Sequence, residues 1–357
     1  MCASDAFATC GVLQARPLHV LETMAMRVER VIIRGLRALR ARDDVFLDPV
    51  RVPYPAACLR GLTGSGKTTY LETIAGLWQW LRRCARQRQY AAPARGTILD
   101  AQFAGMLVSG LPGPRARAWI AWDPTGTLRE LKPGPEVPYV IGAERVDWDP
   151  EFLTFWDEAF EKAESGLSRE DAAPNMVFIE AEGKYVPALR DDELLNPRPA
   201  PAYAVVPRYL ADARGPSHLE GLMRTLYLAR RERWKLLARW IGELRPGLEL
   251  LDRFDEATQR PIFRLESGEL LFVNRLSAGE RSLLINLCMI LRWLAPGGVV
   301  LLDEPELHLH VSLMRSSLSV LAATIEDEFH GQLIVASHAP EVWDYFRRSG
   351  ALIELSP

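Results

Sequence analysis

A glycine-rich segment early in the chain has the residue types and the spacing that bind phosphate. Residues 61–68 read GLTGSGKT, which fits G-x-x-x-x-G-K-[ST], and they lie between a predicted strand and a predicted helix. Glycines let backbone N–H groups curl around phosphate oxygens, and the start of the helix adds partial positive charge. We expect Lys67 to contact the β- and γ-phosphates of ATP and the Thr68 hydroxyl to bind Mg²⁺. The alternative is a glycine-rich turn with a solvated lysine. The expected nucleotide contacts come from Gly61, Gly64, Ser65, Gly66, Lys67, Thr68 and Thr69.

Two adjacent carboxylates follow a run of four apolar residues, VVLL at 299–302. Such a run is typical of a strand buried on both faces, and α/β sheets bind ligands at the carboxyl ends of their strands. We expect Asp303 to hold Mg²⁺ through water. Glu304 is then placed to act as the general base that orients and deprotonates the attacking water. An acidic pair at a helix N-terminus, without a function, is the alternative.

Three further segments give weaker signals on their own. The sequence LSAGE at 276–280 opens a predicted helix, but Ser-x-Gly-Glu is also an ordinary helix cap, so its order after the phosphate loop is the informative feature. His338 follows an apolar strand by two residues and could reach a γ-phosphate, although a lone histidine is more often structural. His308 and His310 lack further Cys or His ligands nearby, which disfavours a zinc site.

The elements expected to position these residues alternate between strands and helices. Such alternation predicts an α/β layer with a mostly parallel sheet. The predicted strands are 26–33, 45–47, 57–59, 118–122, 176–179, 262–265, 270–273, 299–302 and 332–336, and the predicted helices are 68–88, 150–164, 217–244, 278–294 and 311–329.

Composition and charge narrow the class of protein. The chain of 357 residues is 48% hydrophobic and 25% charged, which is globular composition. No apolar run approaches the roughly 20 residues that a membrane helix needs, so we expect no membrane span. The net charge of −3 gives no global attraction to nucleic acid. Five scattered cysteines without a C-x-x-C pair fit a reducing, cytoplasmic location.

The order of the motifs resembles the head of an ABC-type ATPase. The string DEPELHLH at 303–310, followed by SHAP at 337–340, is similar to the AAA_21/AAA_15-like branch. That branch includes the overcoming-lysogenisation-defect nucleases and ATPases of anti-phage defence operons. The opening VIIRGLR at 31–37 resembles the family's first strand, with Arg37 matching a common arginine. The clear resemblance covers about residues 26–90 and 262–357, and the middle of the chain has no relative that we can name.

The resemblance implies a fold and a division of the chain. The fold class is an α/β ABC-ATPase head with a mixed or parallel sheet around the P-loop, a diverged α+β insertion and no long coiled coil. The expected divisions are an N-terminal extension (1–23, which is not native or is disordered, or else is a short ordered arm), an N-terminal ATPase lobe (24–95), the insertion (96–260) and a C-terminal ATPase lobe (261–357).

The resemblance also implies a homodimer or higher oligomer, in which a head-to-tail or face-to-face pair of subunits sandwiches two ATP molecules. Each ATP would lie between the P-loop of one subunit and Ser277, Gly279 and Glu280 of the other, and His338 would be the switch histidine. The P-loop departs from the family because Leu62-Thr63 replaces the common Pro-Asn. The glutamine loop is not recognisable by spacing. Gln102 is the candidate that completes the Mg²⁺ shell, with Gln79, Gln87 and Gln89 as competitors.

Two classes of function remain open. The first is an ATPase that acts as sensor or regulator of a separate effector, expected to be a nuclease, in bacterial anti-phage defence. The acidic span 147–198, with fourteen acidic and five basic residues, would suit a basic partner or is a solvated face. The second is a DNA-repair or chromosome-maintenance ATPase of the RecF/Rad50-like group. It would bind DNA through basic clusters at 82–88 and 230–235. A transporter subunit and an ATP-binding scaffold with little turnover are weaker alternatives.

Overall fold

The computed structural model describes residues 25–35, 39, 41–89, 91–101, 103–123, 139–141, 149–166, 173–182, 184–187, 201–209, 218–349 and 351–355. The extension at 1–23, Arg37 and Gln102 lie outside these residues. The strands are β1 (Arg27–Arg34), β2 (Arg42–Val45), β3 (Ala56–Arg60), β4 (Phe103–Ser109), β5 (Arg117–Trp122), β6 (Tyr139–Ile141), β7 (Met176–Ile179), β8 (Leu248–Phe254), β9 (Pro261–Leu265), β10 (Leu270–Leu271), β11 (Val299–Asp303), β12 (Gln332–Ser337) and β13 (Leu352–Glu354). The helices are α2 (Lys67–Gln87), α3 (Pro150–Ser165), α5 (Leu219–Ala229), α6 (Arg231–Leu244), α7 (Ala278–Trp293), α8 (Val311–Asp327) and α9 (Pro340–Ser349), with 3₁₀ turns η1 (Ile98–Ala101) and η3 (Val273–Arg275).

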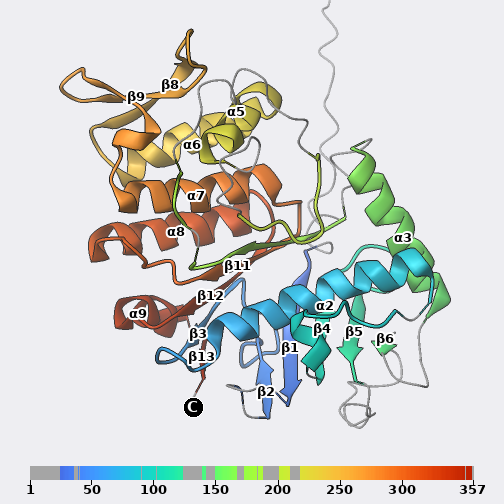
Figure 1. Ribbon diagram of the computed structural model, residues 1–357. Helices are drawn as coiled ribbons and strands as arrows, with labels where there is room; N and C mark the ends of the chain where they lie inside the picture. Colours follow the sequence, from blue (N-terminus) through green and yellow to red (C-terminus); the bar gives the residue numbers. More distant parts are fainter. Residues whose placement is uncertain are drawn as a thin grey trace, which may run out of the picture.

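A parallel sheet with the order β13-β3-β12-β11-β7 forms the centre of the molecule. All its neighbouring strands pair in parallel, and β11 and β12 are buried along their whole length. This burial confirms the prediction made from the apolar runs. Figure 1 shows α2 on one side of the sheet and α7 and α8 on the other. Because every strand ends at the same edge, the residues that follow β3, β7, β11 and β12 are brought together.

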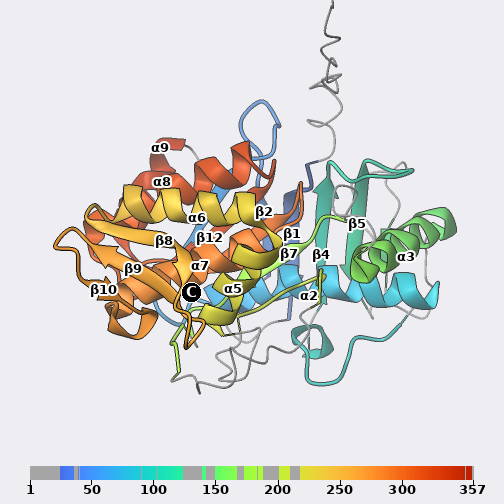
Figure 2. The same ribbon diagram turned by 90° about the horizontal axis from the view of Figure 1, so that it is seen from above.

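A second sheet, β2-β1-β4-β5-β6, packs against the opposite side of α2. Its strands are antiparallel except for the β5–β6 pair. Helix α3 lies at the far end of α2 (Figure 2), where Trp156 contacts Trp78 edge-on, with ring centroids 5.2 Å apart. The predicted helix at 150–164 is therefore confirmed, and its apolar face is part of the core.

The helical stretch predicted at 217–244 is wrong in one respect, because it is two helices. Helix α5 ends at Ala229 and α6 begins at Arg231, and Arg230 between them has φ −143° and ψ 60°. Both helices bury their apolar faces against α7 and the antiparallel sheet β10-β9-β8. The predicted hairpin is confirmed as the antiparallel β9–β10 pair. The predicted strand at 45–47 is shifted, since β2 ends at Val45 and Leu47 forms only an isolated bridge.

The sheets cross the boundaries expected for the lobes and the insertion. Strands β4, β5 and β6 extend the sheet of β1, and β7 is an edge strand of the parallel sheet, although all four lie within 96–260. The division of the chain at residues 96 and 260 therefore stays a prediction about where the sequence diverges from the family, because the sheets do not follow it. Over the described residues the longest helix is α2, with 21 residues, so no long coiled-coil arm is present there. None of the helices in this part of the chain is long and apolar enough to cross a membrane.

Candidate active site

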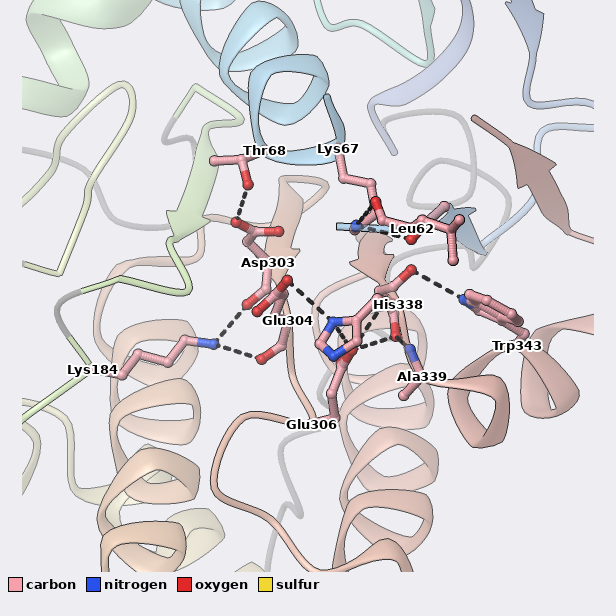
Figure 3. Close-up of polar contacts among 12 residues, drawn as sticks. Leu62, Lys67, Thr68, Lys184, Asp303, Glu304, Glu306, His338, Ala339 and Trp343 are labelled. Carbon is pink, nitrogen blue, oxygen red and sulfur yellow. Dashed lines mark hydrogen bonds and ion pairs between the residues drawn. The ribbon is translucent and has the colours of Figure 1, made fainter. Parts of the chain in front are cut away.

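The phosphate loop connects β3 to α2. Gly64 and Gly66 have φ values of 82° and 87°, a left-handed conformation that glycine adopts without strain. The buried Lys67 folds back over the loop, where its Nζ donates hydrogen bonds of 2.9 Å to the carbonyl oxygens of Gly61 and Leu62 (Figure 3). Its ammonium group is therefore held at the mouth of the loop, next to the backbone N–H groups that precede α2.

Gly61 is required because the loop closes tightly on itself. A Cβ atom at this position would lie 2.3 Å from Ser65 Oγ and 2.9 Å from the carbonyl oxygen of Leu355. Within the described residues, the buried Ser65 Oγ has no hydrogen-bond partner. A buried hydroxyl without a partner is costly, so the loop presents a polar atom that a ligand can satisfy.

Asp303 and Thr68 meet where β11 ends beneath the phosphate loop. Thr68 Oγ1 donates a 2.7 Å hydrogen bond to Asp303 Oδ2. Asp303 is fully buried, and burial raises the pKa of its carboxyl group, opposed by the hydrogen bond from Thr68. Its second oxygen, Oδ1, has no hydrogen-bond partner among the residues that the structure describes. A hydroxyl and one carboxylate beside a phosphate loop fit the donor set that Mg²⁺ takes together with substrate phosphates.

Glu304 leaves the sheet in a strained conformation. Its φ of 43° is left-handed, which is uncommon for a residue with a side chain and is found where a site imposes it. Its backbone N–H donates to the Ala336 carbonyl oxygen at 2.9 Å. Its carboxylate, about one quarter exposed, lies 3.2 Å from His338 Nδ1. The turn therefore directs this carboxylate toward the histidine at the open edge of the sheet.

Glu306 is a carboxylate that the sequence analysis did not select. Its Oε1 accepts hydrogen bonds from Ser337 Oγ at 2.7 Å and from the His338 backbone N–H at 3.1 Å. His338 Nδ1 lies 3.2 Å from this oxygen and 3.2 Å from Glu304, so the ring sits between two carboxylates. Glu306 Oε2 is buried without a hydrogen-bond partner in the described part of the chain. The string DEPE gave a signal for Glu306, because an acid three residues after Asp303 is expected to lie near the same edge of the sheet.

Lys184 is the second residue that the sequence analysis missed. It follows β7, and its Nζ donates to the backbone carbonyl oxygens of Asp303 at 2.7 Å and Glu304 at 3.3 Å. Lys184 and His338 lie on opposite sides of the acidic pair (Figure 3). Burial lowers the pKa of Lys184 to about 8, although the neighbouring carboxylates oppose this shift. The available signal was rarity, since the chain has five lysines among 43 basic residues.

The segment after β7 lies beside Asp303, because Lys184 bonds the Asp303 carbonyl oxygen. Burial raises the pKa of the Asp303 carboxyl group, and the backbone N–H of Ala181, just after β7, is among the groups that oppose this shift. Gln102 lies outside the described residues, so its assignment to the Mg²⁺ shell stays a prediction.

The signature residues Ser277, Gly279 and Glu280 begin helix α7. Ser277 and Glu280 form a capping box, with hydrogen bonds of 3.2 Å from Glu280 N to Ser277 Oγ and 2.8 Å from Ser277 N to Glu280 Oε2. A Cβ on Gly279 would lie 2.4 Å from the His308 carbonyl oxygen, so only glycine fits against the turn after β11. Over the described residues, no hydrogen bond joins Ser277 or Glu280 to the phosphate loop. The exposed start of α7 is thus free to face another molecule.

The histidines at 308 and 310 belong to the turn before α8. His310 is the N-cap of α8, where its side chain accepts from the Ser312 N–H. In the described ranges no group of three or more His, Cys, Asp or Glu side chains is arranged to hold a metal ion.

Several residues of the basic clusters proposed as DNA contacts have partners within the protein. Arg82 binds Asp157 at 3.1 Å and Glu164 at 2.9 Å, and Arg88 lies 3.3 Å from Asp157. In the second cluster Arg231 pairs with Asp252, Lys235 pairs with Glu232, and Arg233 donates to the Leu291 carbonyl. These contacts also show that part of the acidic span 147–198 neutralises helix α2.

A cleft of about 1040 Å³ runs along α2, beginning beside the phosphate loop. Gly35 and Thr69 line the end nearest the loop, and Trp80 and Arg83 line the part further along the helix. Its volume lies at the upper end of the range for small-molecule sites. There is therefore space for a nucleoside next to the loop that would hold its phosphates.

Solved structures that resemble the chain are SMC heads and ATP-binding cassettes. The Smc head bound to the C-winged helix domain of ScpA has 12% sequence identity and a TM-score of 0.48, covering 89% of this chain and 91% of that chain. The SMC head domain from Thermotoga maritima has 14% identity and a TM-score of 0.44, over 89% and 92%. A dimeric ATP-binding cassette in a post-hydrolysis state, bound to ADP and Pi, has 12% identity and a TM-score of 0.36, over 90% of each chain. No curated protein matches the sequence.

One protein family, described as "AAA domain, putative AbiEii toxin, Type IV TA system", matches residues 162–344, slightly more than half of the chain. The match contains Lys184, the start of α7, the acidic pair and His338, and the phosphate loop precedes it. The family match also includes residues 162–260, which lie in the region for which the sequence offered no relative. This part of the match contains β7, which is a strand of the central sheet. The protein belongs to this AAA_21 family of ABC-like ATPases.

Proposed function

We propose that the protein binds ATP with Mg²⁺ at the phosphate loop and hydrolyses it to ADP and phosphate. The observation that carries this proposal is the contact between Thr68 and the buried Asp303, which leaves Asp303 Oδ1 without a hydrogen-bond partner among the described residues. A buried carboxylate oxygen without a partner is costly, and a cation would satisfy it.

Each residue at the edge has a task in this proposal. Lys67 exchanges its bonds to two backbone carbonyls for the phosphate oxygens, and Thr68 and Asp303 hold Mg²⁺. The metal supplies charge neutralisation for the transferred phosphoryl group. Glu304 accepts a proton from the attacking water, and His338 Nδ1, 3.2 Å from Glu304 Oε1, orients that carboxylate.

Release of phosphate from ATP, measured with and without Mg²⁺, tests the proposal. We expect Mg²⁺-dependent turnover by the wild type, a loss of about 10²- to 10⁴-fold in Glu304→Gln, and loss of ATP binding in Lys67→Ala. Glu304→Gln should still bind ATP, which separates the base from the binding residues. Turnover of Glu304→Gln at the wild-type rate would show that another group is the base.

We further propose that the site is completed in a dimer, by Ser277 of a second copy. The exposed capping box at the start of α7 presents backbone N–H groups and the positive end of the helix, which suit the γ-phosphate. A mixing experiment tests this arrangement. Lys67→Ala and Ser277→Arg each inactivate the homodimer, but a mixed dimer contains one site with both residues intact. Recovery of activity on mixing supports a trans role, and no recovery contradicts it.

At the level of the cell, we propose that ATP turnover regulates a separate effector in anti-phage defence. The resemblance of the DEPELHLH string and the family's description as part of a toxin–antitoxin system support an action together with a second gene product. Phage plating on bacteria that carry the gene with its neighbours tests the idea. Lys67→Ala should abolish protection, whereas equal protection by both versions contradicts control by ATP. The DNA-binding alternative has less support, because several residues of its basic clusters are paired internally.

A further inference from the structure

Lys184 is the described lysine that reaches the acidic pair from outside the motifs. Lys184 stands five residues beyond the end of β7. The edge strand β7 pairs with β11 only as far as Ile179 and Leu302. On that side of β11, the carbonyl oxygens of Asp303 and Glu304 have no strand partner. Lys184 Nζ donates to both, at 2.7 and 3.3 Å, and so continues the ladder after the strand has ended.

The direction of these bonds defines the role. The ammonium group binds the backbone of the turn, which leaves the carboxylates of Asp303 and Glu304 directed toward Thr68 and His338. Because Glu304 adopts a left-handed φ of 43°, the turn needs outside contacts to stay in this conformation. The positive charge of Lys184 also interacts favourably with the nearby carboxylates of Asp303, Glu306 and Glu304.

The segment that carries Lys184 is itself held from the helical side of the molecule. Tyr209 Oη donates to the Tyr185 carbonyl oxygen at 3.1 Å, and His218 Nε2 lies 3.1 Å from the Pro187 carbonyl oxygen. His218 is the N-cap of α5. Residues 184–187 therefore connect the start of α5 to the acidic pair.

We propose that Lys184 is a positioning residue for ATP hydrolysis, which caps the end of β11 and holds Glu304 in its working orientation. This inference rests on the proposed ATPase function. The inference gives the segment after β7 a role in holding the turn that carries Glu304. None of the phosphate loop, the acidic pair or the signature residues has been given this role.

Steady-state kinetics on Lys184→Met and Lys184→Arg test the turnover part of the inference. Lys184→Met should lower kcat by about 10- to 100-fold, the range seen when a residue that orients a metal ligand is lost. The dissociation constant for ATP should change little, because the phosphate loop is untouched. Lys184→Arg, which keeps the charge and the donors, should recover part of kcat. The matched control is Lys235→Met, which removes an exposed lysine paired only with Glu232. Wild-type kcat in Lys184→Met, or an equal loss of kcat and ATP affinity without recovery in Lys184→Arg, would overturn the inference.

Amide hydrogen exchange on the nucleotide-free proteins tests whether Lys184 holds the turn after β11, independently of ATP turnover. The N–H group of Glu304 donates to the Ala336 carbonyl oxygen, and the N–H group of Leu307 donates to the Glu304 carbonyl oxygen. Both should exchange faster in Lys184→Met than in the wild type, and at the wild-type rate in Lys235→Met. Faster exchange together with an inactive wild type would refute the ATPase proposal and keep the positioning role. Unchanged exchange would refute the positioning role, whatever the activity.

Discussion

Helix α2 has a cluster of charged residues at each end, and the two clusters differ in how their polar atoms are used. At its start, Lys67 bonds the backbone of the phosphate loop and Thr68 bonds Asp303, and at its end Arg82 and Arg88 face the acidic side of α3. In the first cluster three buried oxygen atoms have no hydrogen-bond partner within the described residues: Ser65 Oγ, Asp303 Oδ1 and Glu306 Oε2.

In the second cluster the charges are matched. Arg82 binds one oxygen of Asp157 and both oxygens of Glu164, and Arg88 binds the other oxygen of Asp157. Trp156, packed on Trp78, fixes the position of α3. The indole Nε1 atoms of Trp78 and Trp156 also lack a hydrogen-bond partner within the described residues, so the contrast lies in the carboxylates. Those of the second cluster are matched and hold the structure together, whereas the first cluster leaves carboxylate oxygens for a ligand to satisfy.

The largest expected effect on stability comes from the matched cluster. Arg82→Met leaves Asp157 and Glu164 without their main partner, and removal of one member of a buried pair costs about 3–5 kcal/mol of unfolding free energy. Chemical denaturation should show this loss. Arg88→Met is the control, because Arg88 is 59% exposed and its pair should contribute less than about 1 kcal/mol. A loss of ATP affinity in Arg82→Met without a loss of stability would reverse the two roles.

A buried carboxylate away from the active site tests whether an unmatched oxygen is costly. Glu220 in α5 has one oxygen without a hydrogen bond, and Arg260 lies 3.7 Å away. Burial raises the pKa of Glu220 from 4.5 to about 7, and Arg260 only partly opposes this. The unfolded chain therefore loses the proton first, and the stability of the folded protein falls as pH rises from about 4.5 to 7 and then levels off.

Replacement of this group should remove that part of the pH dependence. We expect the stability of Glu220→Gln relative to wild type to increase by about 2–3 kcal/mol between pH 4.5 and pH 8, measured by denaturation at each pH. A difference that is constant with pH would mean that Arg260 fully compensates the carboxylate. In that case, the unmatched oxygens of the active site would also be weaker evidence for a ligand.

The smallest expected effects compare a glycine beside the active site with one elsewhere. Gly279→Ala forces a Cβ to within 2.4 Å of the His308 carbonyl and should cost about 1–3 kcal/mol. Gly242, inside α6, has no atom within 4 Å of such a Cβ, so Gly242→Ala should stabilise the protein by about 0.4–1 kcal/mol. Thermal unfolding measures whether Gly279→Ala lowers and Gly242→Ala raises the stability of the protein. An unchanged stability of Gly279→Ala would show that the turn after β11 moves to accommodate the added Cβ.

Much of the central sheet could be predicted because its strands are apolar on both faces. The runs at 176–179, 299–302 and 332–336 became β7, β11 and β12, and Thr68 of the phosphate loop contacts Asp303. The order of the strands could not be predicted, since it depends on packing between distant segments. For this reason β7 was counted with the insertion, and the partners of Arg82, on a helix some seventy residues away, were not anticipated.

Lys184 and Glu306 were missed for a related reason. Lys184 stands in no motif, and the spacing of Glu306 within DEPE does not by itself predict its contacts with Ser337 and His338. Lys184 reaches the acidic pair, and Glu306 reaches His338, because parallel strands end at one edge. The break at Arg230 was missed because the apolar spacing of α5 and α6 resembles that of one continuous helix.

The binding of ATP to Asp303→Asn and Asp157→Asn, measured by calorimetry with and without Mg²⁺, tests the contrast between the two clusters most directly. Both substitutions neutralise a buried carboxylate that contacts α2. We expect the wild type and Asp157→Asn to bind ATP more tightly with Mg²⁺ than without it, and Asp303→Asn to lose that difference. If Asp303→Asn keeps the Mg²⁺-dependent gain, or if Asp157→Asn loses it, the assignment of the first cluster as the ATP–Mg²⁺ site is wrong.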